Sequence, residues 1–209
     1  MRCDQCSNAA TRQPATTTET ETLPPSALSQ PINKTRIAGL SAALAAALAL
    51  GVTQFEGSKP LPYKDIGGVW TACDGDTYDI DPSRIYTPEE CKARLQDQLQ
   101  RHNDRLLACM PLEEAPEHVH AAVLDLGYNI GTGAVCRSSI AAKIKAKDYP
   151  AVCASILRFK NAAGRDCSVR ANNCYGVYKR RVWDAALCQG SLSTTQIAKG
   201  FAGYQEIAP

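Results

Sequence analysis

The chain has 209 residues, with 23 lysines and arginines against 21 aspartates and glutamates, so its formal net charge at pH 7 is only +2. Charges of both signs are interspersed, and we expect no nucleic-acid partner. The length suits one ordinary domain with additional terminal segments. Ten cysteines are many for a reducing cytosol, and eight of them lie beyond an apolar run, between Cys73 and Cys188. We therefore expect disulfides formed in an oxidising compartment.

Metal binding is the alternative use of these cysteines. No two of the eight have CxxC spacing, and the chain has only three histidines, so we expect no metal site and no cofactor. A lone CxxC, Cys3 and Cys6, lies earlier in the chain. We interpret it as incidental, with a redox pair or half of a zinc site as the alternatives.

The first segment, residues 1–33, is rich in Thr, Ser, Pro and Gln and has almost no large apolar side chains. Such a composition cannot bury enough surface to offset the entropy of ordering the chain. The pattern predicts a disordered N-terminal tail.

Residues 34–54 have the pattern of a weak transmembrane or signal segment. Lys34 and Arg36 precede a run of 16 uncharged residues, Ile37–Val52, of which seven are alanine. As a helix it would span about 24 Å, less than the hydrocarbon core of about 30 Å, and the basic residues would keep its N-terminus inside. A releasable signal anchor, a cleaved signal with Ala47-Leu48-Ala49 as the site, and a buried core helix all remain open.

Residues 55–190 are expected to form one mostly helical α+β domain. Short β-prone pieces around glycines over 63–81 predict a small hairpin sheet, and Thr87-Pro88-Glu89-Glu90 is a capping box that opens an amphipathic helix towards Cys109. Further helices are expected over 117–128, 138–147, 149–159 and 177–188. The C-terminal tail, 191–209, has no pattern that we interpret.

Three residues at the start of this domain carry the chemistry. Glu56 follows the apolar stretch, and a carboxyl at the end of a helix, half shielded from water, can remain protonated as a general acid. Asp65 lies in a polar turn region, and a hairpin through Gly67-Gly68 would place Thr71 across from it. An acid, a base and a water-orienting hydroxyl suit inverting glycoside hydrolysis.

The spacing of these residues resembles the signature of phage-type lysozymes, glycoside hydrolase family 24: Glu56-Gly57, then Tyr63-x-Asp65-x-x-Gly68-x-x-Thr71. Two later blocks are also similar to that family. LDLGYNIGTGAVCRSSI (124–140) matches at Asn129, Gly131, Gly133, Ser138 and Ser139, and GVYKRRVWDAALC (176–188) matches at Gly176, Arg180, Arg181 and Cys188.

The resemblance implies a phage-type lysozyme fold, with a small hairpin sheet and a helical lobe, and implies roles for several residues. Glu56 would protonate the glycosidic oxygen, and Asp65 and Thr71 would hold the attacking water. Tyr63, Asn129 and Gly131 would support the substrate cleft, and Arg180 and Arg181 the packing. The chain departs from the family at Cys73, Asp74, Asp76, Phe159 and Asp184, none of them a reacting position.

Within this resemblance the eight domain cysteines become structural. We favour the pairs Cys167–Cys174 and Cys109–Cys136, and then Cys153–Cys188 and Cys73–Cys91, each contributing about 2–4 kcal/mol.

The function that the resemblance implies is that of a phage endolysin. It would be a muramidase that cuts the β-1,4 bond between N-acetylmuramic acid and N-acetylglucosamine in peptidoglycan and so lyses the host. A lytic transglycosylase and a non-catalytic peptidoglycan-binding module are the alternatives.

The family also includes signal-arrest-release endolysins, and this chain looks like one of them. The resemblance implies export by the host Sec machinery and transient tethering in the inner membrane, N-terminus inside and C-terminus outside. An active monomer would then be released to the periplasm. While the run is in the bilayer, Glu56 cannot reach a folded cleft.

Overall fold

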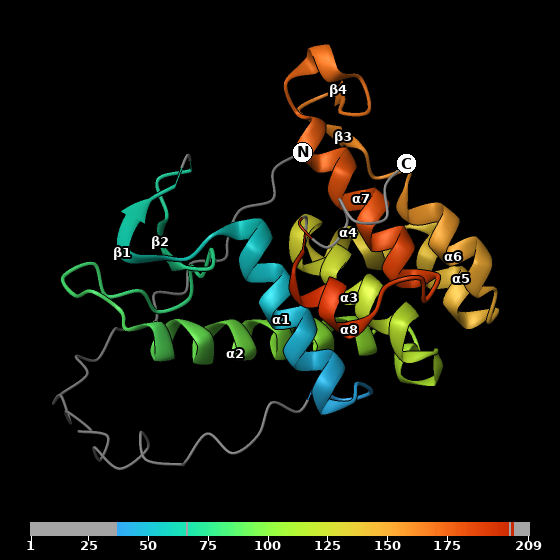
Figure 1. The fold of residues 1–209 in the computed structure, drawn as a ribbon, viewed down its shortest axis with the longest axis horizontal. Coiled ribbons are helices and arrows are strands. Elements are labelled where there is room, and N and C mark those ends of the chain that lie inside the picture. Colours follow the sequence, from blue (N-terminus) through green and yellow to red (C-terminus); the bar gives the residue numbers. More distant parts are fainter. Residues whose placement is uncertain (1–36, 66, 201, 203–209) are drawn as a thin grey trace, which may run out of the picture. The chain divides into compact units, whose positions relative to one another are not determined.

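The computed structural model describes residues 37–65, 67–200 and 202 (Figure 1). The expected N-terminal tail, 1–33, with Cys3 and Cys6, lies outside the described residues. From Ile37 onward the described residues belong to one compact unit.

The apolar run forms most of the first helix, α1 (Ala42–Glu56). Ser41 caps its N-terminus by accepting a hydrogen bond from the amide of Leu44, and Gly57, with a φ of 69°, ends it. The helix packs against α8 (Thr194–Ala198) and α3 (Glu117–Ile130), and both Leu48 and Val52 are fully buried. Within the described part of the chain, no helix has the length and apolar composition needed to cross a membrane.

The expected small sheet is a hairpin of β1 (Lys59–Lys64) and β2 (Trp70–Cys73), joined by a turn through Gly68. The register differs from our expectation, because Thr71 pairs with Tyr63 rather than with Asp65. The Asp65 amide instead donates to the carbonyl of Val69 at 2.9 Å. The Asp65 carboxylate also accepts hydrogen bonds from the amides of Gly67 and Val69, which tightens the turn and moves Thr71 two residues along the strand. No strand forms over Tyr78–Ile80.

The second helix, α2 (Pro88–Leu107), begins where the capping box predicts. The hydroxyl of Thr87 accepts from the amide of Glu90, whose carboxylate accepts from the amide of Thr87. Leu95, Leu99 and Leu106 are buried along one face, as their spacing predicts.

The central helix α3 is buried without interruption from Val119 to Gly127 and contacts α1, α2, α4 and α7. The expected helices around it are present, and α4 and α8 are additional. The elements not yet given are the 3₁₀ turn Leu112–Glu114, α4 (Thr132–Arg137), α5 (Ser139–Lys145), α6 (Tyr149–Ile156), β3 (Asn161–Ala162), β4 (Arg165–Asp166), the 3₁₀ turn Arg170–Asn172 and α7 (Tyr175–Cys188). Figure 1 shows the β3–β4 hairpin beyond the N-terminal end of α7.

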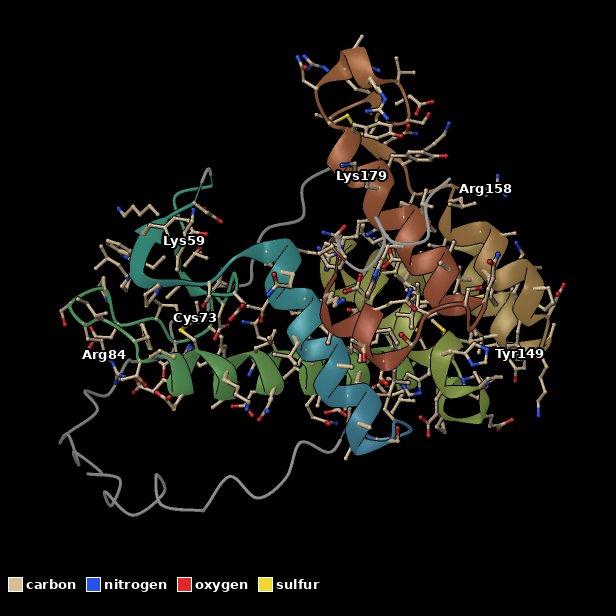
Figure 2. All side chains as sticks on the ribbon, in the orientation of Figure 1. Lys59, Cys73, Arg84, Tyr149, Arg158 and Lys179 are labelled. Atoms are coloured by element: carbon tan, nitrogen blue, oxygen red, sulfur yellow. A yellow bond between two sulfur atoms is a disulfide. The ribbon has the colours of Figure 1, made fainter. Side chains whose placement is uncertain are left out.

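Four disulfides connect these elements, and they are the four pairs favoured above. Cys73–Cys91 links β2 to α2, where Figure 2 labels Cys73 between the hairpin and the helix. Cys109–Cys136 joins the end of α2 to α4, Cys153–Cys188 joins α6 to α7, and Cys167–Cys174 closes the loop before α7.

Candidate active site

Glu56 is the last residue of α1, and its side chain is 28% exposed. Its neighbour Phe55 lies edge-on against the buried ring of Trp183, at 4.9 Å between ring centroids. The guanidinium of Arg180 lies 4.7 Å from the centroid of Phe55. This aromatic packing orients the end of the helix, so the position of Glu56 depends on how α1 docks on α7.

A buried ion-pair network connects the Glu56 carboxyl to the interior of the helical lobe. Arg180 Nη1 lies 2.5 Å from Glu56 Oε1, and Nε and Nη2 each lie 3.0 Å from one oxygen of Asp125. Asp125 is fully buried. Burial acts to raise its pKa, but the charge of Arg180, together with hydrogen bonds to this carboxyl, holds the pKa below its usual range.

A second buried pair lies in the same network. Arg181 Nη2 lies 2.9 Å from Asn129 Oδ1 and 3.0 Å from Asp184 Oδ2, and both Arg181 and Asp184 are fully buried. Burial, and then the nearby Asp125, raise the pKa of Asp184 well above its usual range, although Arg181 acts in the opposite direction. The two expected packing arginines thus fix Glu56 and Asn129 from one helix.

A cavity of about 450 Å³ opens in front of Glu56, between the segment after β2, α2 and the end of α3. Its lining is polar and carries charges of both signs: Glu56, Asp74, Gly75, Asp76, Thr77, Tyr78, Gln98, Arg101, His102, Arg105, Tyr128 and Asn129. A smaller cavity of about 240 Å³ on the other side of Glu56 is lined by Phe55, Asn129, Gly176, Val177 and Arg180 as well. Glu56 and Asn129 are common to both.

Asp74 places a second carboxyl in the larger cavity. It is 3% exposed, and Ser58 Oγ lies 3.5 Å from its Oδ2 atom. Burial, and more weakly the charge of Glu56, raise the pKa of Asp74, while hydrogen bonds from Thr53 and Ser58 lower it. The hydroxyl of Tyr128 lies 2.7 Å from the backbone carbonyl of Asp74 and 2.9 Å from Gln98 Oε1. These contacts connect the segment after β2 to α2 and α3 in the wall of the cavity.

The structure brings together only part of the predicted site. Glu56 and Asn129 meet at the cavities, whereas Asp65 and Thr71 line neither of them. The carboxylate of Asp65 is engaged in its own turn, and the buried hydroxyl of Thr71 donates to the carbonyl of Val69 at 3.1 Å. Tyr63 is half-buried in β1, beneath the ammonium of Lys59.

Gly131, the remaining predicted residue, has a φ of 87° and separates α3 from α4. It therefore contributes to the turn after Asn129 rather than to the cavity lining. A side chain there would strain the backbone.

The sequence interpretation missed the contribution of α2. Gln98, Arg101, His102 and Arg105 all line the larger cavity. Their spacing places them on one face of the helix, next to the apolar face. That polar stripe was visible in the sequence, but nothing there indicated what it would face.

The arrangement is a polar cleft with a half-buried carboxyl that is fixed through one oxygen, which suits acid–base chemistry. Among the described residues, no group of three or more His, Cys, Asp or Glu side chains is placed to hold a metal ion.

Comparison with known proteins agrees with this fold. The family model for phage lysozyme matches residues 53–184. A probable prophage lysozyme of Escherichia coli (strain K12) is 32% identical over 170 residues, covering 73% of this chain and 94% of the relative. A protein of Escherichia phage 933W named SAR-endolysin is 34% identical over 173 residues, covering 73% and 94%.

Among solved structures, the active form of the P1 phage endolysin Lyz has a TM-score of 0.60 at 19% identity, covering 73% of this chain and 86% of that one. This likeness supports the fold. Together with the sequence matches it defines a glycoside hydrolase whose substrate is peptidoglycan. The chain belongs to the phage lysozyme family, and it is a phage endolysin.

Proposed function

We propose that Glu56 is the general acid of this lysozyme and that the enzyme inverts the configuration at the anomeric carbon. The observation that carries the proposal is the placement of Glu56 between two cavities, with Oε1 fixed by Arg180. Oε2 is then left to carry the proton to the glycosidic oxygen. From the family resemblance alone, we extend the proposal to Asp65 and Thr71, which line neither cavity in this structure: they hold the water that attacks from the opposite face of the sugar, and Asp65 accepts its proton.

Glu56→Gln tests the role of the acid, because the amide has the same shape but cannot donate the proton. We expect turnover of peptidoglycan to fall by about 10²–10⁴-fold, while the melting temperature stays close to that of the parent protein. The newly formed reducing end, analysed by NMR before mutarotation, should be the α anomer. A β anomer would mean retention and would remove Asp65 from the role of base.

Asp65→Asn distinguishes hydrolysis from the alternatives. A hydrolase that needs Asp65 to activate water should lose activity, whereas a lytic transglycosylase should continue to cleave and form anhydro ends. A binding module would bind the cell wall and release no soluble fragments from it. Mass analysis of the released fragments separates the three results.

We also propose that Ile37–Gln54 is a releasable anchor, exported through the Sec machinery and tethered N-terminus inside. Released protein would act as a periplasmic monomer. Two observations support this: several relatives are named SAR-endolysin, and α1 both contributes to the core and ends at Glu56. Cleavage after Ala49 would remove Leu44 and Leu48, two buried core side chains, so the folded domain favours retention of the segment.

The test is intact-mass analysis and N-terminal sequencing of soluble periplasmic protein after the membrane is depolarised, together with a lysis assay. Active, soluble protein that retains Ile37–Gln54 would support the releasable anchor. A new N-terminus near Leu50 would mean ordinary signal cleavage. The protein would then be a lysozyme whose activity is not regulated by release of an anchor.

A further inference from the structure

The face of α2 that lines the larger cavity carries two arginines. Arg101 and Arg105 are four residues apart, one helical turn, with His102 beside them. All three line the same cavity as Glu56. A substrate bound in the cavity at Glu56 therefore lies next to this face of α2.

Arg101 has one acidic neighbour, the buried Asp76, which lines the same cavity. Arg101 Nη2 lies 3.6 Å from Asp76 Oδ1, but Asp76 is already held by Arg94, whose Nε lies 2.7 Å from Oδ2. The Arg101 side chain is 37% exposed and its guanidinium lies 5.1 Å from the ring centroid of Tyr78. Arg105 is exposed and makes no salt bridge with any described residue.

The positive charge on this face of α2 comes from the two arginines and not from His102. His102 is half-buried, with Nδ1 2.8 Å from the carbonyl of Gln98. Burial, and then the charges of Arg105 and Arg101, lower its pKa, so the imidazole is neutral at pH 7. His102 therefore adds no charge to this face of the helix.

The same cavity lining also carries carboxyl groups, of which Asp76 pairs with Arg94 and Arg101. Glu56 and the buried Asp74 also line the cavity. An anionic group on a bound substrate is repelled by Glu56 and Asp74 and attracted to the arginines of α2, so these charges favour one orientation of a polymer in the cleft.

We propose that Arg101 and Arg105 form a carboxylate-binding subsite that recognises the muramic acid unit of peptidoglycan and sets its orientation at Glu56. Planar guanidinium groups bind carboxylates in a bidentate geometry. The inference rests on the proposed placement of the scissile bond at Glu56. The carboxylate has two possible sources: the peptide stem, or the lactyl group of a glycan strand without peptide.

The test compares the double variant R101Q/R105Q with a control, K92Q/K145Q, which removes two exposed charges elsewhere, on α2 and α5. Each enzyme is assayed on intact sacculi, on glycan strands stripped of peptide by an amidase, and on sacculi whose carboxyl groups have been converted to amides. Thermal melting checks that the variants fold.

For R101Q/R105Q on intact sacculi we expect KM to rise about tenfold and kcat to stay unchanged, because the substitutions remove a charge-assisted contact to the substrate. The defect should disappear on amidated sacculi, where parent and variant have equal KM. In intact sacculi the lactyl carboxyl is bound in the amide to the peptide, so a defect confined to intact sacculi assigns the carboxylate to the stem. The amidase frees the lactyl carboxylate, and a defect that is also present on stripped strands shows that the subsite binds this group as well. R101K/R105K, which keeps the charge, should recover part of the loss.

The subsite is disproved if R101Q/R105Q and the control K92Q/K145Q have the same KM on intact sacculi. It is also disproved if the rise in KM for R101Q/R105Q is as large on amidated sacculi as on intact ones. A fall in kcat on every substrate would indicate a structural role instead. Failure of the proposed function is distinguishable, because it would appear as full activity of Glu56→Gln on all three substrates.

Discussion

Arg180 binds Glu56 from a position 124 residues later in the chain, with Nη1 2.5 Å from Oε1. The same guanidinium binds both oxygens of the buried Asp125. The carboxyl proposed as the acid is thus attached to the interior of the helical lobe, and its position reports whether that lobe is correctly folded.

Arg180→Gln should therefore destabilise the protein by about 3–5 kcal/mol, because it leaves the charge of Asp125 buried without its partner. Urea unfolding measures the change. Arg158→Gln, at an exposed arginine labelled in Figure 2, is the control and should change stability by less than about 0.5 kcal/mol. Equal midpoints for the two variants would mean that Asp125 does not depend on Arg180.

His120 should make the protein less stable as the pH falls. It is fully buried, Nε2 lies 2.6 Å from Asn103 Oδ1, and Asn103 Nδ2 donates to the carbonyl of Ala38 at 3.1 Å. Burial lowers the pKa of His120 from 6.5 to about 4. Below pH 6.5 the unfolded chain takes up a proton that the folded protein does not, so stability is complete above that pH and is lost down to about pH 4.

The loss should reach about 3 kcal/mol at the lower limit. Urea unfolding at several pH values measures it in the parent protein and in His120→Gln, which keeps a donor towards Asn103 but does not titrate in this range. The variant should lose less stability on acidification. Identical pH profiles would show that His120 is not the titrating group.

Asp184 should have the opposite effect. Its pKa is raised in the folded state, mainly by burial, so as the pH rises above about 4 the unfolded chain releases a proton that the folded protein retains. Stability relative to Asp184→Asn should fall by about 1.4 kcal/mol per pH unit until the folded pKa is reached. The free energy of unfolding is measured with and without Asp184→Asn in a His120→Gln background, which removes the contribution of the histidine. A difference between these two proteins that stays constant from pH 5 to pH 7 would contradict the prediction.

Gly51 allows α1 and α8 to approach closely. A Cβ atom there would lie 2.5 Å from the backbone carbonyl oxygen of Ile197. Gly51→Ala should destabilise the protein by about 1–3 kcal/mol, despite the higher helix propensity of alanine. Gly176→Ala is the matched control, because no atom lies within 4 Å of its Cβ position, and its melting temperature should be unchanged or higher. A Gly51→Ala protein as stable as this control would mean that α8 moves freely away from α1.

Local patterns determined several features of this protein before any fold was considered. The start of α2 follows from the capping box of Thr87 and Glu90, whose side chains are three residues apart. The hairpin turn follows from Gly67-Gly68. The end of α1 at Glu56 follows from the change from apolar residues to glycine. The function came from the spacing of Glu56, Asp65 and Thr71, read through the family resemblance.

Tertiary structure alone decided which groups share an environment. Arg180 meets Asp125 and Glu56, the carbonyl of Asp74 meets Tyr128, and α8 covers α1, all across long separations in sequence. The acidic and basic side chains of the cavity lining likewise come from elements that no local pattern relates. Burial is the largest cause of the pKa shifts of Asp74, His120 and Asp184, because desolvation depends on what the whole fold packs around a side chain.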